Sequence, residues 1–193
     1  MSRIASLNRE TKETQINLKF NLDGNGEYKI YTGVGFFDHM LELFACHGSF
    51  DLELTCKGDL QVDGHHSVED IGIVLGKAIA ETTINKVGIA RYSAVTIPMD
   101  EALATVTIDL SGRPFLVFNA DLEGKTGDFD NELVEEFFRA LCNYGGITMH
   151  INLHYGSNNH HKIEAIFKAF ARALAGASKI VGDKLPSSKG VLE

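Results

Sequence analysis

Gly64-His65-His66-Ser67-Val68-Glu69-Asp70 is the stretch that decides how the rest of this sequence is interpreted. The apolar residues that follow it recur at helical spacing and predict that the stretch opens a helix: Ile71, Val74, Leu75, Ala78 and Ile79. Because residues four apart lie on one helix face, His65 and Glu69 can bind one metal ion together. His66 lies about 100° further round the helix and faces another direction. Taken alone, the acidic pair is equally typical of a first turn stabilised by the helix dipole, so a metal site requires a second indication.

A second copy of the motif supplies that indication. The stretch His160-His161-Lys162-Ile163-Glu164 has the same order of two histidines, two further residues and a glutamate. It also opens an amphipathic helical pattern, whose apolar positions are Ile163, Ile166, Phe167, Phe170, Ala171 and Leu174. Two such motifs in one chain favour metal binding over a chance arrangement of surface side chains.

The two motifs belong to a longer internal repeat. Residues 13–24 align with residues 101–112 without a gap, and His39 then aligns with Glu136. The shift between aligned positions changes along the chain, as expected for two halves that share one fold and differ in loop length. The repeat makes His39 and Glu136 equivalent positions, and both of these residue types can bind a metal ion.

The predicted elements follow the same order in both halves. Alternation and helical spacing predict strands at 14–22, 28–32 and 50–54, with helices at 36–47 and 65–87. The second half has strands at 102–110, 115–119 and 147–153, with helices at 132–143 and 161–181. The turn at 23–26 predicts that the first two strands form a hairpin.

We therefore predict an α+β protein made of two repeated β-β-α-β-α halves, each a sheet with two helices on one face. The chain forms one domain over residues 1–193, with an internal repeat of about 1–90 and 91–193. No linker separates the halves, and residues 88–98 form the natural junction.

Composition excludes several classes of protein. Hydrophobic residues make up 44% and charged residues 23%, which is ordinary for a soluble globular chain. No run of about 18 apolar residues predicts a membrane span, and the net charge of −8 argues against a nucleic-acid partner. The N-terminal residues 1–14 lack a secretory hydrophobic segment, and three cysteines without a Cys-x-x-Cys pair are expected to be reduced core residues: Cys46, Cys56 and Cys142. We expect a cytoplasmic protein.

The candidate ligands determine which metal ions fit. Imidazole and carboxylate groups without thiolates suit Mn, Fe, Co, Ni or Zn and favour a catalytic over a structural or storage site. If the halves are related by a pseudo-twofold axis, each ion can take a His/Glu pair from one motif and a histidine from the other. We hypothesise one site of His65, Glu69 and His161, and a second site of His160, Glu164 and His66. His39 and Glu136 complete one site each, and the sequence leaves open which, and whether the sites lie within or between chains.

Other polar residues could act on a substrate. Cationic side chains that could bind a phosphate are Arg91, Arg113, Lys168 and Lys189, although a cation of this kind, taken singly, is more often a solvated surface charge. Carboxylates directly before predicted strands could carry a proton: Glu13, Asp100 and Glu101. His47 follows the first helix and is either a cation at its C-terminus or a pocket residue.

Five motifs together resemble one enzyme family. They are Arg9-Glu-Thr-Lys-Glu13-Thr, Gly35-Phe-Phe-Asp-His-Met, Asp63-Gly-His-His-Ser-Val-Glu-Asp, Ser111-Gly-Arg-Pro, and the long stretch from His160 to Leu174. This set, in this order and over nearly the whole chain, resembles the imidazoleglycerol-phosphate dehydratases of histidine biosynthesis. The resemblance implies a ribosomal protein S5 domain 2-like fold and no fused phosphatase domain.

The resemblance also implies a reaction, a cofactor and an assembly. The reaction is the dehydration of imidazoleglycerol phosphate to imidazoleacetol phosphate by a lyase with two Mn²⁺ ions per active site. A homo-oligomer of 24 subunits is implied, with active sites built from several chains. With both nitrogens of the substrate's imidazole on metal ions, the ring can be held as an imidazolate and expel the hydroxyl group of the adjacent carbon.

By match to the family's motifs, the resemblance implies roles for individual residues. The implied metal ligands are His39, His65, His66, Glu69, His160, His161 and Glu164, together with Glu136. The implied substrate contacts are Glu13, His47, Arg91, Arg113, Lys168, Ser187 and Lys189. Glu13 is the implied catalytic carboxylate, and we count His65, Glu69 and Glu164 with it as catalytic residues.

One position departs from the pattern. Many family members carry histidine where this chain has Glu136, in Val134-Glu-Glu136-Phe-Phe. A carboxylate there is still a reasonable ligand and makes the site somewhat more selective for ions that prefer oxygen. Two other classes of function compete with the dehydratase. A two-metal hydrolase would release phosphate or an amine, and a metal-carrying or scaffold shell would have no pocket for an anion.

Overall fold

A computed structural model describes residues 3–192. The first half contains, in chain order, β1 (Ile4–Glu10), β2 (Thr14–Asn21), β3 (Tyr28–Tyr31), α1 (Gly35–Gly48), β4 (Asp51–Gly58) and α2 (His65–Thr82). The second half repeats this order with β5 (Tyr92–Met99), β6 (Ala102–Asp109), β7 (Phe115–Asn119), α3 (Leu133–Gly145), β10 (Thr148–Tyr155) and α4 (Asn159–Ser178). A short hairpin of β8 (Lys125–Thr126) and β9 (Phe129–Asp130) is inserted before α3.

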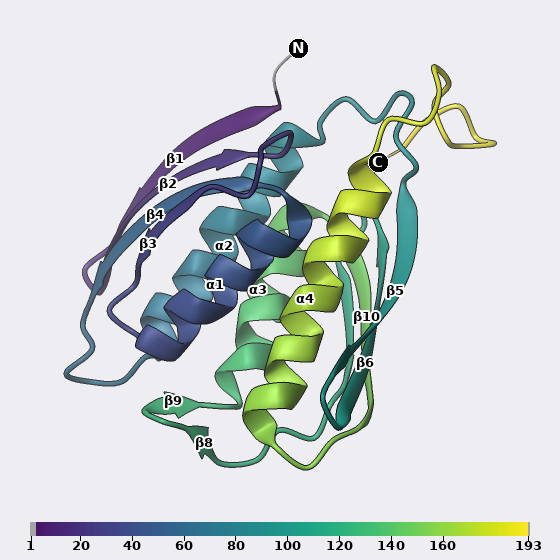
Figure 1. The fold of residues 1–193 in the computed structure, drawn as a ribbon. Helices are drawn as coiled ribbons and strands as arrows, with labels where there is room; N and C mark the ends of the chain where they lie inside the picture. Colours follow the sequence, from purple (N-terminus) through teal and green to yellow (C-terminus); the bar gives the residue numbers. More distant parts are fainter. Residues whose placement is uncertain (1–2, 193) are drawn as a thin grey trace.

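Two four-stranded sheets form the outer layers, and the four helices lie between them (Figure 1). The strand orders are β1-β2-β4-β3 and β5-β6-β10-β7, which are equivalent under the repeat. Helices α1 and α2 cover the first sheet, whereas α3 and α4 cover the second. The halves meet where α2 packs on α3 and α1 packs on α4. This arrangement confirms the predicted α+β class and the two similar halves.

Each four-stranded sheet has one strand more than the sequence pattern predicted, and the β8–β9 hairpin of the second half was not predicted either. β1 and β5 are edge strands that pair antiparallel with β2 and β6. The predicted hairpin of the first two strands is wrong, because β3 does not pair with β2. Instead, β3 crosses over and pairs parallel with β4, in register from Tyr28 opposite Leu52. The turn signal at 23–26 marks a change of direction, but it does not say which strand the chain pairs with next.

Aromatic side chains join the two halves in one core. The stacked rings of Phe44 on α1 and Phe170 on α4 have centroids 4.9 Å apart. Glycines allow α2 and α3 to approach closely, since a Cβ atom at Gly72 or Gly76 would lie 2.6 Å from a carbonyl oxygen of α3. Any side chain there would push the helices apart, and with them the elements that carry the histidine motifs.

Two features bear on the sequence predictions. Cys56 and Cys142 are buried and reduced as expected, but Cys46 is exposed, so its expected core position is wrong. None of the helices in residues 3–192 is both long and apolar enough to cross a membrane.

Candidate active site

Side-chain caps fix the start of both helices that carry the histidine motifs. The Asn158 side chain accepts hydrogen bonds from the backbone N–H groups of His160 and His161, at 2.9 and 3.4 Å. At the start of α2, Asp63 Oδ1 accepts from the N–H of His65 at 2.8 Å. Such caps satisfy N–H groups that have no partner within the helix, so both His-His pairs occupy an ordered first turn.

One cluster of metal-ligating side chains is formed within residues 3–192. It consists of His39 on α1 with His160 and Glu164 on α4, and one ligand atom of each lies within 4.8 Å of the others. The Nε2 atoms of His39 and His160 lie 3.1 and 3.0 Å from Glu164 Oε1. The contact between α1 and α4 thus answers a question that the sequence left open: within one chain, His39 joins His160 and Glu164.

Glu164 is charged despite its burial. Burial alone would raise its pKa, but hydrogen bonds from Lys168, His39 and His160 outweigh this effect and lower the pKa to about 2. Lys168 Nζ lies 2.6 Å from Glu164 Oε2 and therefore occupies the oxygen that the histidines leave free. The cluster presents a carboxylate and two imidazoles to one point.

The residues of the first motif that are equivalent to this cluster lie farther apart. His65 Nε2 and Glu69 Oε2 on α2 are 3.9 Å apart. Glu136 on α3 is the repeat counterpart of His39, and its Oε2 lies 3.8 Å from Arg139 Nε. Because α2 packs on α3 as α4 packs on α1, these three residues occupy the places that correspond to the closed cluster.

The remaining histidine of each motif is bound by a carboxylate of its own half. His66 Nδ1 lies 3.0 Å from Asp59 Oδ2, and His161 Nδ1 lies 2.7 Å from Glu101 Oε2. These hydrogen bonds raise the pKa of both imidazoles. Within one chain, neither histidine joins the cluster at Glu164, so the pairings hypothesised from the sequence require a second chain. Occupation of Nδ1 leaves Nε2 of each ring as the available ligand atom.

Glu13 and Glu101 are equivalent in the repeat but have different surroundings. Hydrogen bonds from His161 and from the N–H groups of Asn158 and Ser157 lower the pKa of Glu101 well below its usual range. Glu13 is 54% exposed, and its Oε1 lies 3.9 Å from His66 Nε2. Of the two carboxylates, Glu13 is therefore the one free to exchange a proton with a substrate.

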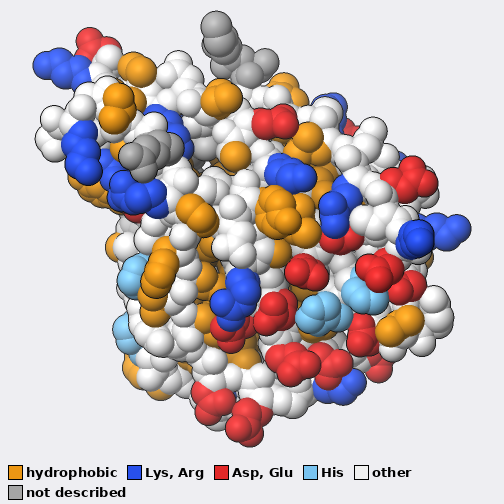
Figure 2. Space-filling view, turned by 180° about the vertical axis from the view of Figure 1, so that it is seen from behind, with side chains coloured by type: hydrophobic (Ala, Val, Ile, Leu, Met, Phe, Trp, Pro, Cys, Tyr) orange, Lys and Arg blue, Asp and Glu red, His pale blue; other side chains and the backbone are white. Residues whose placement is uncertain are grey.

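A cationic cavity of about 160 Å³ lies at the end of the molecule where the C-terminal segment folds back. Arg91, Arg113, Ser187 and Lys189 line it, so the structure brings together four of the residues predicted to bind phosphate. Arg91 is held by Asp109, with Nε 2.8 Å from Oδ1, and by the carbonyl oxygen of Pro186 at 2.9 Å. Figure 2 shows lysine and arginine side chains gathered at this end, and histidines among acidic side chains elsewhere on the same face.

Comparison with known proteins tests the resemblance. A family model described as imidazoleglycerol-phosphate dehydratase matches residues 32–174. The imidazoleglycerol-phosphate dehydratase of Thermodesulfovibrio yellowstonii is 58% identical over 98% of this chain and 100% of its own length. That of Caldicellulosiruptor saccharolyticus is 54% identical over 99% of both chains. The chain belongs to the imidazoleglycerol-phosphate dehydratase family. It is thus an enzyme of histidine biosynthesis with a dehydratase's reaction class.

Solved structures of imidazoleglycerol-phosphate dehydratases have the same fold. The enzyme from Staphylococcus aureus is 47% identical, with a TM-score of 0.84 over 92% of this chain and 99% of that chain. The enzyme from Pyrococcus furiosus is 35% identical, with a TM-score of 0.85 over 96% of this chain and 100% of that chain. The repeated α+β architecture is therefore the architecture of this dehydratase family.

Two predicted substrate contacts lie apart from the cationic cavity in this family member. Lys168 lies beside Glu164, and its Nζ also approaches Met99 Sδ at 3.2 Å. His47, near the end of α1, has a lowered pKa because of its burial and the nearby cations Lys168 and Arg172. A phosphate contact from Lys168 would have to be made outside this cavity, and the substrate contacts assigned to Lys168 and His47 stay predictions.

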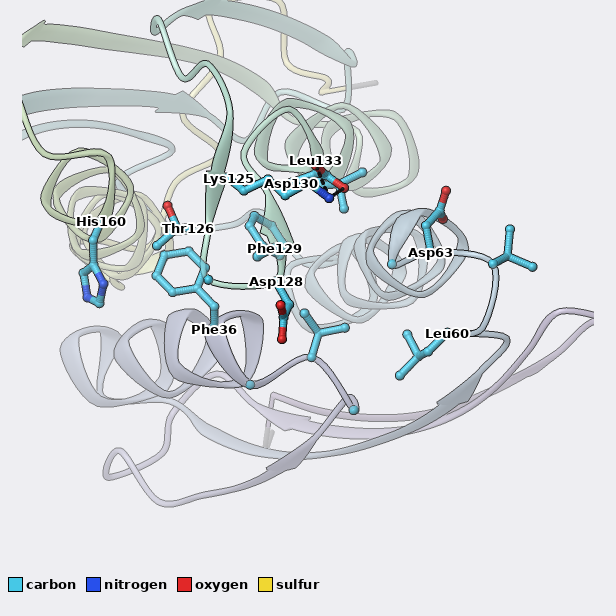
Figure 3. A pocket seen from close by; sticks show the side chains of 16 residues that line it. Phe36, Leu60, Asp63, Lys125, Thr126, Asp128, Phe129, Asp130, Leu133 and His160 are labelled. Atoms are coloured by element: carbon cyan, nitrogen blue, oxygen red, sulfur yellow. Dashed lines mark hydrogen bonds and ion pairs between the residues drawn. The ribbon is translucent and has the colours of Figure 1, made fainter.

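A cavity of about 610 Å³ connects the starts of the two motif helices (Figure 3). Figure 3 shows His160 at one side of it and Asp63 at the other, with Phe36 and Phe129 between them. The inserted β8–β9 hairpin lines this space, and the first half, as described from residue 3 onward, contains no counterpart of the hairpin. The cavity between the two His-His motifs is thus lined by apolar side chains, such as Phe36 and Phe129, and by charged ones, such as Asp128 and Asp130.

Sequence reasoning missed the residues that hold the ligands in place. No role was predicted for Asp59, and Glu101 was considered only as a proton carrier. A signal was present for Glu101, because the repeat aligns it with Glu13 directly before equivalent strands. No comparable signal exists for Asp59, whose repeat counterpart is Gly156 after β10.

Proposed function

We propose that the chain removes water from imidazoleglycerol phosphate to give imidazoleacetol phosphate, with two Mn²⁺ ions per active site. The name of the family and of its relatives supplies the substrate and reaction class. The observation in this chain that carries the proposal is the cluster of His39, His160 and Glu164. We also propose a cytoplasmic location, because the substrate is a water-soluble phosphate ester of a biosynthetic route.

The donor set fits a divalent ion of intermediate hardness. Nitrogen and oxygen donors without thiolate suit Mn²⁺, and the low pKa of Glu164 keeps one ligand anionic at neutral pH. His39, His160 and Glu164 would hold one ion, while His65, Glu69 and Glu136 would hold the other. Glu136 supports Mn²⁺ further, because it adds a second carboxylate oxygen to the latter group.

His66 and His161 support an assembly in which active sites lie between chains. Each is fixed through Nδ1 by a carboxylate and keeps Nε2 available, yet neither joins the cluster at Glu164 in its own chain. We propose that each completes a metal site of a neighbouring subunit, in a homo-oligomer of 24 chains. In such an assembly the full ligand set exists only in the oligomer.

The chain's own residues would bind the substrate and move its protons. Arg91 and Arg113, with Ser187 and Lys189, would hold the phosphate, since guanidinium groups bind phosphate oxygens in a fixed bidentate geometry. When bound, the two ions would act as Lewis acids on the ring nitrogens of the substrate. Glu13 would accept the proton from the carbon next to the one that loses its hydroxyl group. Release of water leaves an enol, which becomes the ketone of the product.

The direct test is product formation by the manganese-loaded protein. Incubation with imidazoleglycerol phosphate should give a ketone whose enol absorbs in alkali, without release of inorganic phosphate. Release of phosphate without the ketone would instead support the two-metal hydrolase. Full activity after complete removal of divalent ions would contradict the role proposed for the cluster.

A further inference from the structure

A buried polar group lies beneath the turn that carries Glu13. Asp70 on α2 is only 6% exposed. Its Oδ1 forms an ion pair with Arg9 Nη2 of β1 at 2.8 Å, and its Oδ2 accepts a hydrogen bond from Thr14 Oγ1 of β2 at 2.5 Å. Both oxygens are therefore used to attach the sheet to the helix that bears His65, His66 and Glu69.

Thr14 closes the turn in which Glu13 sits. The N–H of Thr11 donates to the carbonyl oxygen of Thr14 at 2.9 Å. In the other direction, Thr11 Oγ1 accepts from the N–H groups of Glu13 and Thr14, at 3.1 and 2.9 Å. The turn is thus rigid in itself, and the Thr14–Asp70 hydrogen bond joins it to α2.

The repeat provides an internal comparison for this polar group. Arg9 lies opposite Ile16 in the β1–β2 pair, as Ile97 lies opposite Ala104 in the β5–β6 pair. The positions equivalent to Thr14 and Asp70, the first of β6 and the sixth residue from the first histidine of the motif, are Ala102 and Ala165. All three equivalents are apolar, so the same architecture forms in the second half without the polar group.

Stability alone does not explain why Asp70 and its polar partners are present. Buried ion pairs are often no more stabilising than apolar residues of similar volume. Within residues 3–192, the buried side-chain polar atoms without a hydrogen-bond partner are Arg9 Nε and Ser67 Oγ. Arg9 is the ion-pair partner of Asp70, and Ser67 lies three residues before Asp70 on α2. The first half, in which Glu13 is exposed, thus contains the polar cluster around Asp70. The second half, in which hydrogen bonds hold Glu101, has no such cluster at the equivalent positions.

We propose that Asp70, with Arg9 and Thr14, is a positioning residue that holds the Glu13 turn in a fixed place relative to the ligand-bearing start of α2. The proposal rests on the proposed function, in which Glu13 moves a proton of the substrate. A misplacement of a catalytic group by about 1 Å can cost about 100-fold in rate. The effect should therefore fall on kcat rather than on binding of substrate or metal.

A pair of conservative variants tests the hydrogen bond. Thr14→Val removes the hydroxyl at nearly constant volume and should lower kcat about 10- to 100-fold, with KM changed less than about threefold. Thr14→Ser keeps the donor and should restore most of kcat. The matched control is Thr82→Val, which removes another buried hydroxyl of α2, bonded to Ala78 and Ile79, and should leave kcat unchanged. Equal kcat values for Thr14→Val and wild type would overturn the proposal.

A triple variant gives these three positions of the first half the residue types found at the equivalent positions of the second half. The triple change Arg9→Ile, Thr14→Ala and Asp70→Ala should give a folded protein that binds Mn²⁺ with unchanged stoichiometry but has the low kcat of Thr14→Val. Amide hydrogen exchange separates this proposal from the proposed function, because it needs no turnover. Exchange at Glu13 and Thr14 should become at least about 10-fold faster in Thr14→Val and in the triple variant. Unchanged exchange in both would overturn the positioning role, whereas an inactive wild type would overturn only the function.

Discussion

Glu13 and Glu101 occupy equivalent positions of the repeat but differ in their hydrogen-bond partners and exposure. Glu101 accepts hydrogen bonds from His161, Ser157 and Asn158, and these keep it ionised and in place. Glu13 is more than half exposed and approaches His66 only at 3.9 Å. The sequence placed both residues before strands but could not distinguish them, because their difference lies in partners from distant segments. In the structure Glu101 orients His161, whereas Glu13 is more exposed, and proton transfer by Glu13 is our proposal.

Glu13→Gln should abolish most turnover without affecting the metal sites. The amide cannot accept a proton, so kcat should fall about 100- to 10,000-fold, the usual contribution of general acid–base catalysis. Manganese content and thermal stability should match the wild type. Glu10→Gln, an exposed change in the same region, is the control and should be fully active. Near-normal turnover of Glu13→Gln would remove Glu13 from the mechanism.

Glu164 predicts how the stability of the metal-free protein depends on pH. Its pKa is lowered from 4.5 to about 2 in the folded chain, so its ionised form stabilises the fold at pH values above 4.5. This contribution is lost as the pH falls through about 2. Metal-free wild type should therefore melt several degrees above Glu164→Gln at pH 7, with the difference narrowing between pH 4.5 and 2. A difference in melting temperature that stays constant over this range would contradict the assigned ionisation.

At the scale of elements, the sequence predicted all four helices and six of the eight strands of the two large sheets, but not the edge strands β1 and β5. β1 places Arg9 at an inward position, which breaks its apolar alternation, and β5 contains Pro98, which is typical of an edge or a non-strand segment. The parallel pairing of β3 with β4 was also not predicted, because pairing partners depend on the path of the whole chain. Strong periodicity was sufficient to predict a helix or strand where one of its faces is buried and the other is exposed to solvent.

Carboxylates at the ends of strands should set the metal affinity of the motif helices. Asp59 follows β4 and Glu101 precedes β6, and each orients one histidine through Nδ1. Asp59→Asn and Glu101→Gln should each weaken Mn²⁺ binding about 10- to 100-fold, as is usual for such supporting groups. Titration calorimetry of each variant, with Glu53→Gln on the outer face of β4 as control, measures the effect. Wild-type affinity in both variants would contradict it.

The cavity between β5, β7 and the C-terminal segment should determine phosphate affinity. Arg113 is 56% exposed and has Asp109 at 3.9 Å, so its guanidinium is available to an anion. Arg113→Ala should raise KM about 10- to 100-fold and weaken inhibition by inorganic phosphate by a similar factor. Lys29→Ala, an exposed change on β3, should leave both quantities unchanged. If Arg113→Ala retains wild-type KM and phosphate inhibition, the cavity does not bind the phosphate.

At the scale of the whole molecule, the pseudo-twofold repeat accounts for the doubled ligand set. Helices α1 and α4 bring His39, His160 and Glu164 together, and α3 and α2, which also pack on each other, carry the repeat counterparts Glu136, His65 and Glu69. The repeat of the motif along the chain is what predicts these residues as ligands. It could not predict which residues meet, because that depends on how the helices of the two halves cross between the sheets. For His66 and His161 the prediction is harder still, since the other ligands of their metal sites would come from another chain.

Anomalous diffraction at the manganese edge, from crystals of the manganese-loaded protein, tests the central claim most directly. The account predicts two ions per chain, one bound by His39, His160 and Glu164 and one by His65, Glu69 and Glu136. Each ion should also contact Nε2 of His66 or His161 from a neighbouring subunit. Fewer than two ions per chain, or ions bound away from these residues, would contradict the account.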